Sequence, residues 1–204
     1  MCGRFTLTLD ADEIRTALRL GQIPAEWQPR RNIAPTEAVA VVVDAATRAV
    51  AWMRWGLVPS WAKDISIGSR MFNARAETLA EKPSFRAALQ QRRCLILADG
   101  FYEWQKPASG RGKSQPFYFR LQDNGPFMFA GLWESWRQGD GETLRSCTLI
   151  TCAANATVAP IHERMPVILL GDAPWQWLAA PAQSLLAPLP AEALTVEKVS
   201  GMPT

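Results

Sequence analysis

The chain has 204 residues, of which 48% are hydrophobic and 20% charged, as in an ordinary soluble globular protein. No apolar run approaches the roughly 20 residues of a membrane span, and Asp10, Asp12 and Glu13 stand where the apolar part of a signal peptide would be. We therefore expect a cytoplasmic protein with no membrane partner. The net charge is only +3, but 17 of the 22 basic residues are Arg, whose planar guanidinium matches phosphate oxygens and favours an anionic partner.

The first segment alternates between regular elements and turn signals. Residues 4–9 predict a short strand, and Asp10 with Glu13 three residues later forms the capping box of a helix. A Pro-rich, basic connector follows at residues 24–36. Residues 38–55 then predict a hairpin of two buried strands.

Two further segments have more than one interpretation. Residues 55–61, Trp-Gly-Leu-Val-Pro-Ser-Trp, are apolar but broken by Gly and Pro, which excludes a regular helix or strand. They form either a loop packed over the core or a rigid apolar wedge near a site. Residues 72–78 are dense in polar groups, which predicts a site loop or the start of a helix.

The rest of the chain is rich in short strands. Pro83 opens a helix, and residues 105–116 form a basic loop rich in Gly and Ser. Strands are expected at residues 93–98, 100–104, 117–121, 127–133, 146–152, 167–170 and 194–199. Because strands dominate without regular βαβ alternation, the sequence predicts one β-rich α+β domain over residues 1–204.

The four cysteines contain no Cys-x-x-Cys pair, and no other Cys or His lies at zinc-ligand spacing. Cys94, Cys147 and Cys152 lie in apolar runs, which predicts core thiols. We expect neither a metal nor a cofactor.

Cys2 has a special position, because removal of Met1 would make it the first residue. It would then carry a free α-amine, with a pKa of about 8, and a thiol, with a pKa of about 8.5, two atoms apart. Such a pair condenses with an aldehyde to an imine and closes to a five-membered thiazolidine. From position alone, the simpler interpretation is a small residue at a tolerant chain end.

Three polar residues stand in apolar or aromatic surroundings. Glu103 lies between Tyr102 and Trp104, where burial would raise its pKa and suit it to proton transfer, although strand alternation alone favours a side chain that points to solvent. His162 is the only His and has a pKa suited to acid–base work, but a lone His is more often structural. Asn73 either orients a ligand or caps a turn.

Six motifs occur in one order along the chain. They are MCGRF at residues 1–5, RNIAPT at 31–36, WGLVPSW at 55–61, NARAET at 73–78, GFYEW at 100–104 and HERMP at 162–166. This series resembles the SRAP family, the SOS-response-associated peptidase-like proteins. The resemblance covers residues 2–170, and the tail at 171–204 adds little to it.

The resemblance implies a pseudo-barrel of mostly antiparallel strands with flanking helices. It also implies covalent capture of abasic sites in single-stranded DNA, and at single-strand/double-strand junctions, through a thiazolidine between the N-terminal Cys and C1′ of the opened sugar. This linkage would shield the strand from cleavage. Carried over to this chain, Cys2 is the nucleophile and Asn73, Glu103 and His162 are the catalytic group around it, with the division of proton transfers between Glu103 and His162 left open.

The same resemblance, together with side-chain chemistry, implies a DNA-binding set. Arg side chains in the matching motifs would contact phosphates, and Trp and Pro side chains would stack on bases or fill the gap of the missing base. The expected set is Arg4, Arg31, Pro35, Trp61, Arg75, Trp104 and Arg164. We expect a monomer that associates with the nucleoid when it is bound to DNA.

Two other functions compete with this one. The family name suggests a peptidase or hydrolase with an N-terminal nucleophile, but only Met1 precedes Cys2, which leaves no propeptide for self-cleavage. The other is a non-covalent single-strand binding module in which Cys2 is inert. An AP-lyase activity is compatible with the crosslinking function, because an imine alone permits strand cleavage.

Overall fold

The structure is a computed structural model that describes residues 2–107, 109–137, 139 and 141–201. The strands are β1 (Arg4–Leu7), β2 (Arg30–Ile33), β3 (Ala38–Val42), β4 (Val50–Trp55), β5 (Asn73–Arg75), β6 (Arg93–Ala98), β7 (Gly100–Gln105), β8 (Gln115–Leu121), β9 (Phe127–Arg137), β10 (Thr143–Ala153), β11 (Arg164–Pro166), β12 (Ile168–Leu169) and β13 (Leu194–Lys198). The helices are α1 (Ala11–Ala17), α2 (Pro83–Gln91) and α3 (Ala173–Ala179), with short 3-10 turns at η1 (Ile65–Arg70), η2 (Ala76–Thr78), η3 (Gln183–Leu185) and η4 (Ala191–Ala193).

Five strands form a closed ring, which is the barrel that the resemblance implies. The pairing runs β10, β4, β3, β6 and β9, and β9 then pairs with β10 again. Only β4 and β10 are parallel within this ring. Beyond the ring, β5 and β11 pair with the C-terminal end of β10, so the segments that carry Asn73 and Arg164 flank one strand.

A second, fully antiparallel sheet packs against the barrel in the order β13, β8, β7, β1 and β2. The ring of Phe5 on β1 joins the two layers, because it contacts Trp55 at 5.0 Å and Phe129 at 5.6 Å between ring centroids. Phe101 on β7 stacks on Phe119 at 4.9 Å on the same side. This aromatic core fixes β1, and with it the start of the chain, against the barrel.

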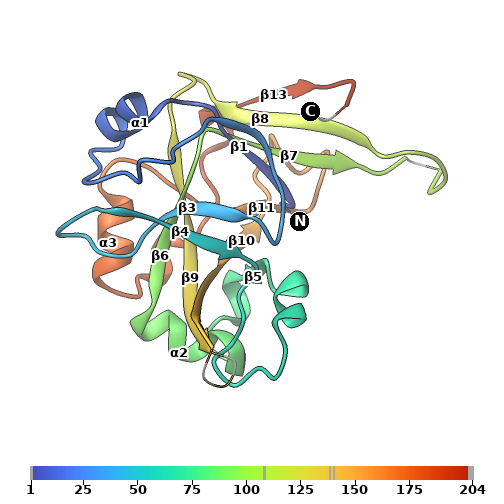
Figure 1. Ribbon diagram of the computed structural model, residues 1–204. Helices are drawn as coiled ribbons and strands as arrows, with labels where there is room; N and C mark the ends of the chain where they lie inside the picture. Colours follow the sequence, from blue (N-terminus) through green and yellow to red (C-terminus); the bar gives the residue numbers. More distant parts are fainter. Residues whose placement is uncertain (1, 108, 138, 140, 202–204) are drawn as a thin grey trace.

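The helices lie at the outside of the two layers (Figure 1). The capping box of α1 is confirmed, since Asp10 accepts hydrogen bonds from two backbone amides and Glu13 bonds back to the amide of Asp10. The helix α3 packs on the barrel through the fully buried Trp177, whose Nε1 donates to the carbonyl oxygens of Cys94 and Gly131. Cys94, Cys147 and Cys152 are buried, which confirms their assignment to the core.

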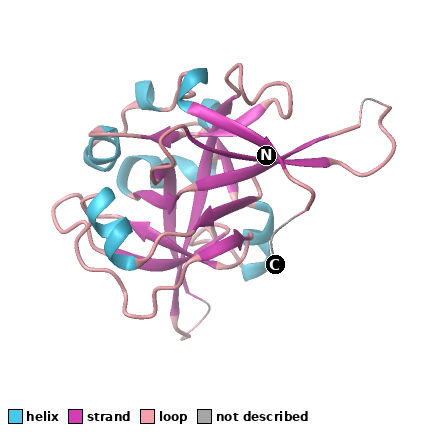
Figure 2. Ribbon diagram, turned by 90° about the horizontal axis from the view of Figure 1, so that it is seen from above, coloured by secondary structure: helices cyan, strands magenta, loops and turns pink. Residues whose placement is uncertain are grey.

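Strands β7 and β8 extend beyond the body of the molecule as a long hairpin (Figures 1 and 2). Their pairing continues to Gln105 opposite Gln115, so the predicted loop at residues 105–116 is shorter than expected. In both views, the N-terminal end of the chain lies close to the base of this hairpin.

Three segments differ from the prediction or decide between its alternatives. The end of the predicted connector is strand β2, which pairs with β1, and the polar segment after residue 72 begins with strand β5 rather than with a loop or a helix. In the segment 55–61, residues 55–59 are buried while Trp61 is 60% exposed. The segment is therefore a packed loop that ends in an exposed aromatic side chain.

Candidate functional site

Cys2 is completely buried immediately before β1. Its carbonyl oxygen accepts a hydrogen bond of 2.7 Å from Nδ2 of Asn73, which β5 presents from the edge of the barrel. The Oδ1 atom of Asn73 is buried and has no hydrogen-bond partner among the described residues. The fold therefore brings two of the predicted catalytic residues into contact.

A buried carboxylate holds β1 in place. Asp99, which is 6% exposed and directly precedes β7, accepts hydrogen bonds from the hydroxyl groups of Thr6 and Thr8 and from the amide of Thr8. The hydroxyl of Thr6 also lies 3.0 Å from that of Tyr118 on β8. Asp99 is not among the residues predicted from the sequence, although a single acidic residue directly after the apolar run 94–98 is a signal that could have identified it.

The neighbouring glycine is part of this arrangement. A Cβ atom on Gly100 would lie 2.1 Å from the hydroxyl oxygen of Tyr118, which real structures do not allow. Gly100 therefore permits the close approach of β8, and thus the contact between Tyr118 and Thr6.

Glu103 lies on β7 beside the start of β1. Arg4 pairs with Tyr102, so the next pair in the antiparallel register places Gly3 opposite Glu103. Glu103 is only 1% exposed, and this burial raises its pKa to about 7. The solvent-facing side chain that alternation favoured is wrong, because Phe101 and Glu103 share the face that packs on the barrel.

The thiol of Cys2 is less acidic than the sequence suggested. Burial raises its pKa well above the ordinary value, and the negative charge of Glu103 acts in the same direction. The thiol is therefore protonated at neutral pH in this structure. Any reaction at sulfur needs a base to accept its proton, and Glu103 is an ionisable neighbour.

His162 lies in the turn that follows β10. Its Nδ1 accepts a hydrogen bond of 2.9 Å from the amide of Arg164, which places the proton of the neutral ring on Nε2. Burial lowers the pKa of His162, so the ring is mostly neutral at pH 7. The same turn is attached to β7, because Nε2 of Gln105 donates to the carbonyl of Pro160 at 2.9 Å.

A hollow of about 590 Å³ opens between this turn and the projecting hairpin. Its lining includes His162 and Trp104, two predicted site residues, together with Lys106, which follows β7, and Lys113, which precedes β8. Glu163 supplies a carboxylate at its border. Trp104 is half-buried, so part of its ring is open to this space.

The predicted Arg contacts have different environments. Arg75 is exposed on β5, and Arg4 is half-buried with its guanidinium on the carbonyl of Gly3. Arg164 makes a bidentate salt bridge with Glu77, with N–O distances of 2.7 and 2.9 Å, and also donates to the carbonyl of Thr151. A phosphate that bound Arg164 would therefore compete with Glu77.

The remaining predicted DNA contacts are not part of the hollow beside His162. Arg31 lines a separate hollow of about 740 Å³ with Tyr102 and Tyr118. Pro35 is half-buried between β2 and β3. Trp61 lies at a third, open depression. The structure thus brings Asn73 and the segment of Glu103 to the start of the chain at Cys2, whereas the predicted DNA contacts lie at several separate places.

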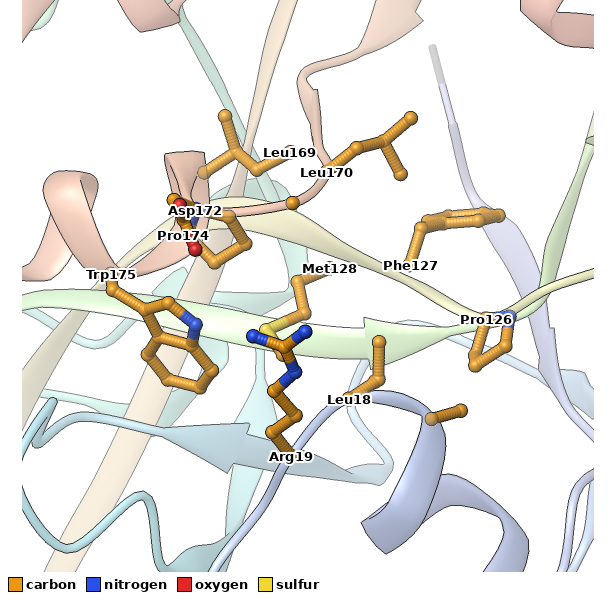
Figure 3. A pocket seen from close by; sticks show the side chains of 12 residues that line it. Leu18, Arg19, Pro126, Phe127, Met128, Leu169, Leu170, Asp172, Pro174 and Trp175 are labelled. Atoms are coloured by element: carbon orange, nitrogen blue, oxygen red, sulfur yellow. The ribbon is translucent and has the colours of Figure 1, made fainter.

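A further pocket, of about 380 Å³, lies between the end of α1, the start of β9 and the start of α3 (Figure 3). The side chains of Arg19, Met128 and Trp175 surround it. None of the predicted site residues lines it. Helices α1 and α3 lie at the side of the molecule opposite the marked N-terminal end in Figure 1.

None of the helices in the described part of the chain has the length and apolar character of a membrane span. No group of three or more His, Cys, Asp or Glu side chains within those residues is arranged to hold a metal ion.

Comparison with known proteins identifies curated relatives over nearly the whole chain. The abasic site processing protein YoqW of Bacillus subtilis is 41% identical over 211 residues, which cover 99% of this chain and 93% of that protein. The abasic site processing protein HMCES of Xenopus tropicalis is 35% identical over 223 residues, covering 87% of this chain and 66% of that protein.

Solved structures have the same fold. A Bordetella bronchiseptica protein superposes with a TM-score of 0.84 at 30% identity, covering 98% of this chain and all of that one. A Bacteroides thetaiotaomicron protein gives a TM-score of 0.82 at 26% identity, covering 96% of this chain and 91% of that one. The family described as SOS response associated peptidase (SRAP) matches residues 1–202. This chain therefore belongs to the SRAP family.

Proposed function

We propose that this protein processes abasic sites in single-stranded DNA by forming a covalent thiazolidine between Cys2, once Met1 has been removed, and C1′ of the opened sugar. The observation that carries the proposal is the position of Cys2. Asn73 holds its carbonyl, and Glu103, with a pKa raised to about 7, lies opposite the adjoining residue. The names of the curated relatives, which are abasic site processing proteins, support abasic sites as the substrate.

The reaction starts at nitrogen. The α-amine of Cys2 adds to the aldehyde carbon C1′ and forms a carbinolamine, whose hydroxyl leaves as water after it receives a proton. A carboxyl group with a pKa near 7 is a suitable donor, because at neutral pH about half of it is protonated. In our proposal Glu103 supplies this proton, and the buried Oδ1 of Asn73 accepts a hydrogen bond from the amine.

The reaction ends at sulfur. Loss of water leaves a protonated imine. The thiol of Cys2 adds to its carbon and gives up the thiol proton, while the nitrogen keeps its own proton, so that the ring closes with the net release of one water. Glu103 is ionised after it has protonated the leaving hydroxyl, so it can accept the proton of the thiol. Without such a base the proton stays on the sulfur, because burial raises the pKa of the thiol. We assign His162, which is neutral at pH 7, to the sugar side, where ring opening needs a proton to leave the C1′ hydroxyl and a proton to reach the ring oxygen. Closure of the ring removes the imine that would permit strand cleavage.

A denaturing gel tests the proposal. The protein is incubated with a single-stranded oligonucleotide that has one abasic site, and covalent species are counted after heating in detergent. We expect a shifted band for the native sequence and none for Cys2→Ala. A native protein that binds the strand but leaves no band that survives denaturation would support the non-covalent binding module.

The family description also names a peptidase, so hydrolysis is the second candidate. Cys2→Ser separates the two functions, because a hydroxyl nucleophile supports hydrolysis but cannot form a thiazolidine. Peptide cleavage that Cys2→Ser retains, without any DNA adduct in the native protein, would favour the peptidase.

A further inference from the structure

We infer that the hairpin of β7 and β8 is a lysine-bearing arm that holds the backbone phosphates of a DNA strand in the hollow beside His162. The inference rests on the proposed function, because it assumes that a DNA strand passes the site. It adds a binding element, formed by Lys106 and Lys113, that neither the sequence motifs nor the family description supplies.

The position of the two lysines is the first observation. The whole chain has only five Lys, and two of them, from the two ends of the segment that connects β7 and β8, line the same hollow of about 590 Å³. Both are exposed, so their ammonium groups are available to a ligand. Trp104 lies on the lining of the same hollow and offers an aromatic face to a neighbouring base.

Charge is the second observation. The hairpin segment from Trp104 to Pro116 contains Lys106, Arg111 and Lys113 but no Asp or Glu. Among the described residues that line the hollow, Glu163 alone carries a carboxylate, and its side chain is exposed. A hollow with two cations, one exposed anion and an aromatic side wall suits a phosphodiester chain with bases.

The hollow includes one of the predicted catalytic residues. His162 lines the hollow itself, and the positive charge of Lys106 contributes to the lowered pKa of its ring. Gln105 fastens the turn of residues 160–163 to the arm by a hydrogen bond to Pro160. A phosphate held by Lys106 would therefore belong to a nucleotide close to the one that reacts.

The test measures equilibrium binding in a Cys2→Ala background, so that no crosslink forms. The probe is a fluorescent single-stranded oligonucleotide with a tetrahydrofuran abasic analogue, titrated at 50 to 200 mM salt. The variant Lys106→Ala/Lys113→Ala should bind at least tenfold more weakly at 50 mM salt. The slope of log K against log salt should become shallower by about 1.4, since each contact to a single strand contributes roughly 0.7.

The matched control is Lys82→Ala/Arg86→Ala, which removes two exposed positive charges at α2, far from the arm in Figure 1. It should leave the slope within about 0.3 of the parent. Glu163→Gln should bind the probe slightly more tightly. Equal slopes for the arm variant and the control would overturn the inference, and so would a parent protein that does not bind the probe.

A second measurement keeps the two proposals separate. With Cys2 restored, thiazolidine formation with formaldehyde, which has no phosphate, should proceed at the same rate in the arm variant and in the native protein. A slower rate would show that the lysines act on the chemistry and would contradict the strand-holding role. A protein that binds the probe through the arm but never crosslinks abasic DNA would refute the proposed function alone.

Discussion

Nδ2 of Asn73 donates a hydrogen bond of 2.7 Å to the carbonyl oxygen of Cys2, across 71 residues of sequence. Asn73 is presented by a three-residue strand that exists only because it pairs in parallel with β10. The position of the Cys2 backbone thus depends on the pairing of β5 with the barrel strand β10, and not only on residues near it in the sequence.

This hydrogen bond gives the first prediction. Asn73→Asp keeps the shape of the side chain but cannot donate, and Asn73→Ala removes the group altogether. Because a net hydrogen bond is worth about 1 kcal/mol, we expect either change to slow crosslinking by at least about fivefold. Single-turnover kinetics with abasic DNA measure the rate, and a rate equal to that of the native protein would show that Asn73 has no positioning role.

Glu103 gives a prediction about the pH dependence of the rate. If its protonated form delivers the proton to the leaving hydroxyl, the native rate should fall as the pH rises through about 7. Glu103→Gln should be about 100-fold slower and should lose this fall in rate. An unchanged pH profile in Glu103→Gln would assign the titration to another group.

The same carboxyl group predicts how stability changes with pH. The pKa of Glu103 is raised from 4.5 to about 7 by burial, so the folded protein holds this proton more tightly than the unfolded chain. This proton's contribution to the free energy of unfolding is complete below pH 4.5 and is lost as the pH rises through 7. The expected loss in the free energy of unfolding is roughly 3 kcal/mol.

Urea unfolding between pH 5 and 8 measures this effect. The native protein should lose stability relative to Glu103→Gln as the pH rises. The lowered pKa of His162 acts in the opposite sense, which is why the comparison between the two proteins is the quantity to use. A constant difference between them across this range would contradict the raised pKa.

Arg164 gives a prediction about competition for its guanidinium. Glu77 occupies both ends of the guanidinium fork, and this contact lowers the pKa of Glu77. In Glu77→Gln the pairing weakens and the guanidinium becomes available, so we expect single-stranded DNA to bind several-fold more tightly. Arg164→Ala should lose this gain in the double variant. Unchanged affinity in Glu77→Gln would indicate that Arg164 has a structural role, in which its salt bridge links β11 to the residues after β5.

Trp61 is the most exposed large apolar side chain among the described residues, at 60%. If a base stacks on it, Trp61→Ala should weaken DNA binding by about 1–3 kcal/mol and Trp61→Phe by less. Neither change should alter the free energy of unfolding, because the side chain contributes little to the core. Fluorescence anisotropy measures the affinity, and equal binding by Trp61→Ala would remove Trp61 from the DNA-binding set.

Local signals in the sequence predicted the elements that depend on neighbouring residues. The capping box of Asp10 and Glu13 and the hairpin of β3 and β4 are both confirmed. Each of them is specified within a few residues. In the capping box, side chains form hydrogen bonds with the backbone of the same turn, and in the hairpin a short turn joins the two strands.

Features that depend on distant pairing could not be predicted in this way. Alternation places Phe101 and Glu103 on one face, but it cannot say that the barrel covers that face. β5 is too short to show any period, and its pairing with β10 joins segments about 75 residues apart. The resemblance supplied the candidate residues of the site. The structure adds the contacts of Asp99 with β1 and the hollow from which we infer a role for Lys106 and Lys113.

The central claim is that Cys2 forms the bond. Intact-protein mass spectrometry, before and after incubation with an abasic single-stranded oligonucleotide, tests it most directly. We predict a free protein that has lost Met1 and then a denaturation-stable species with the mass of protein plus oligonucleotide minus one water, absent in Cys2→Ala. A protein that has lost Met1 and forms no adduct, or an adduct that persists in Cys2→Ala, would contradict the account.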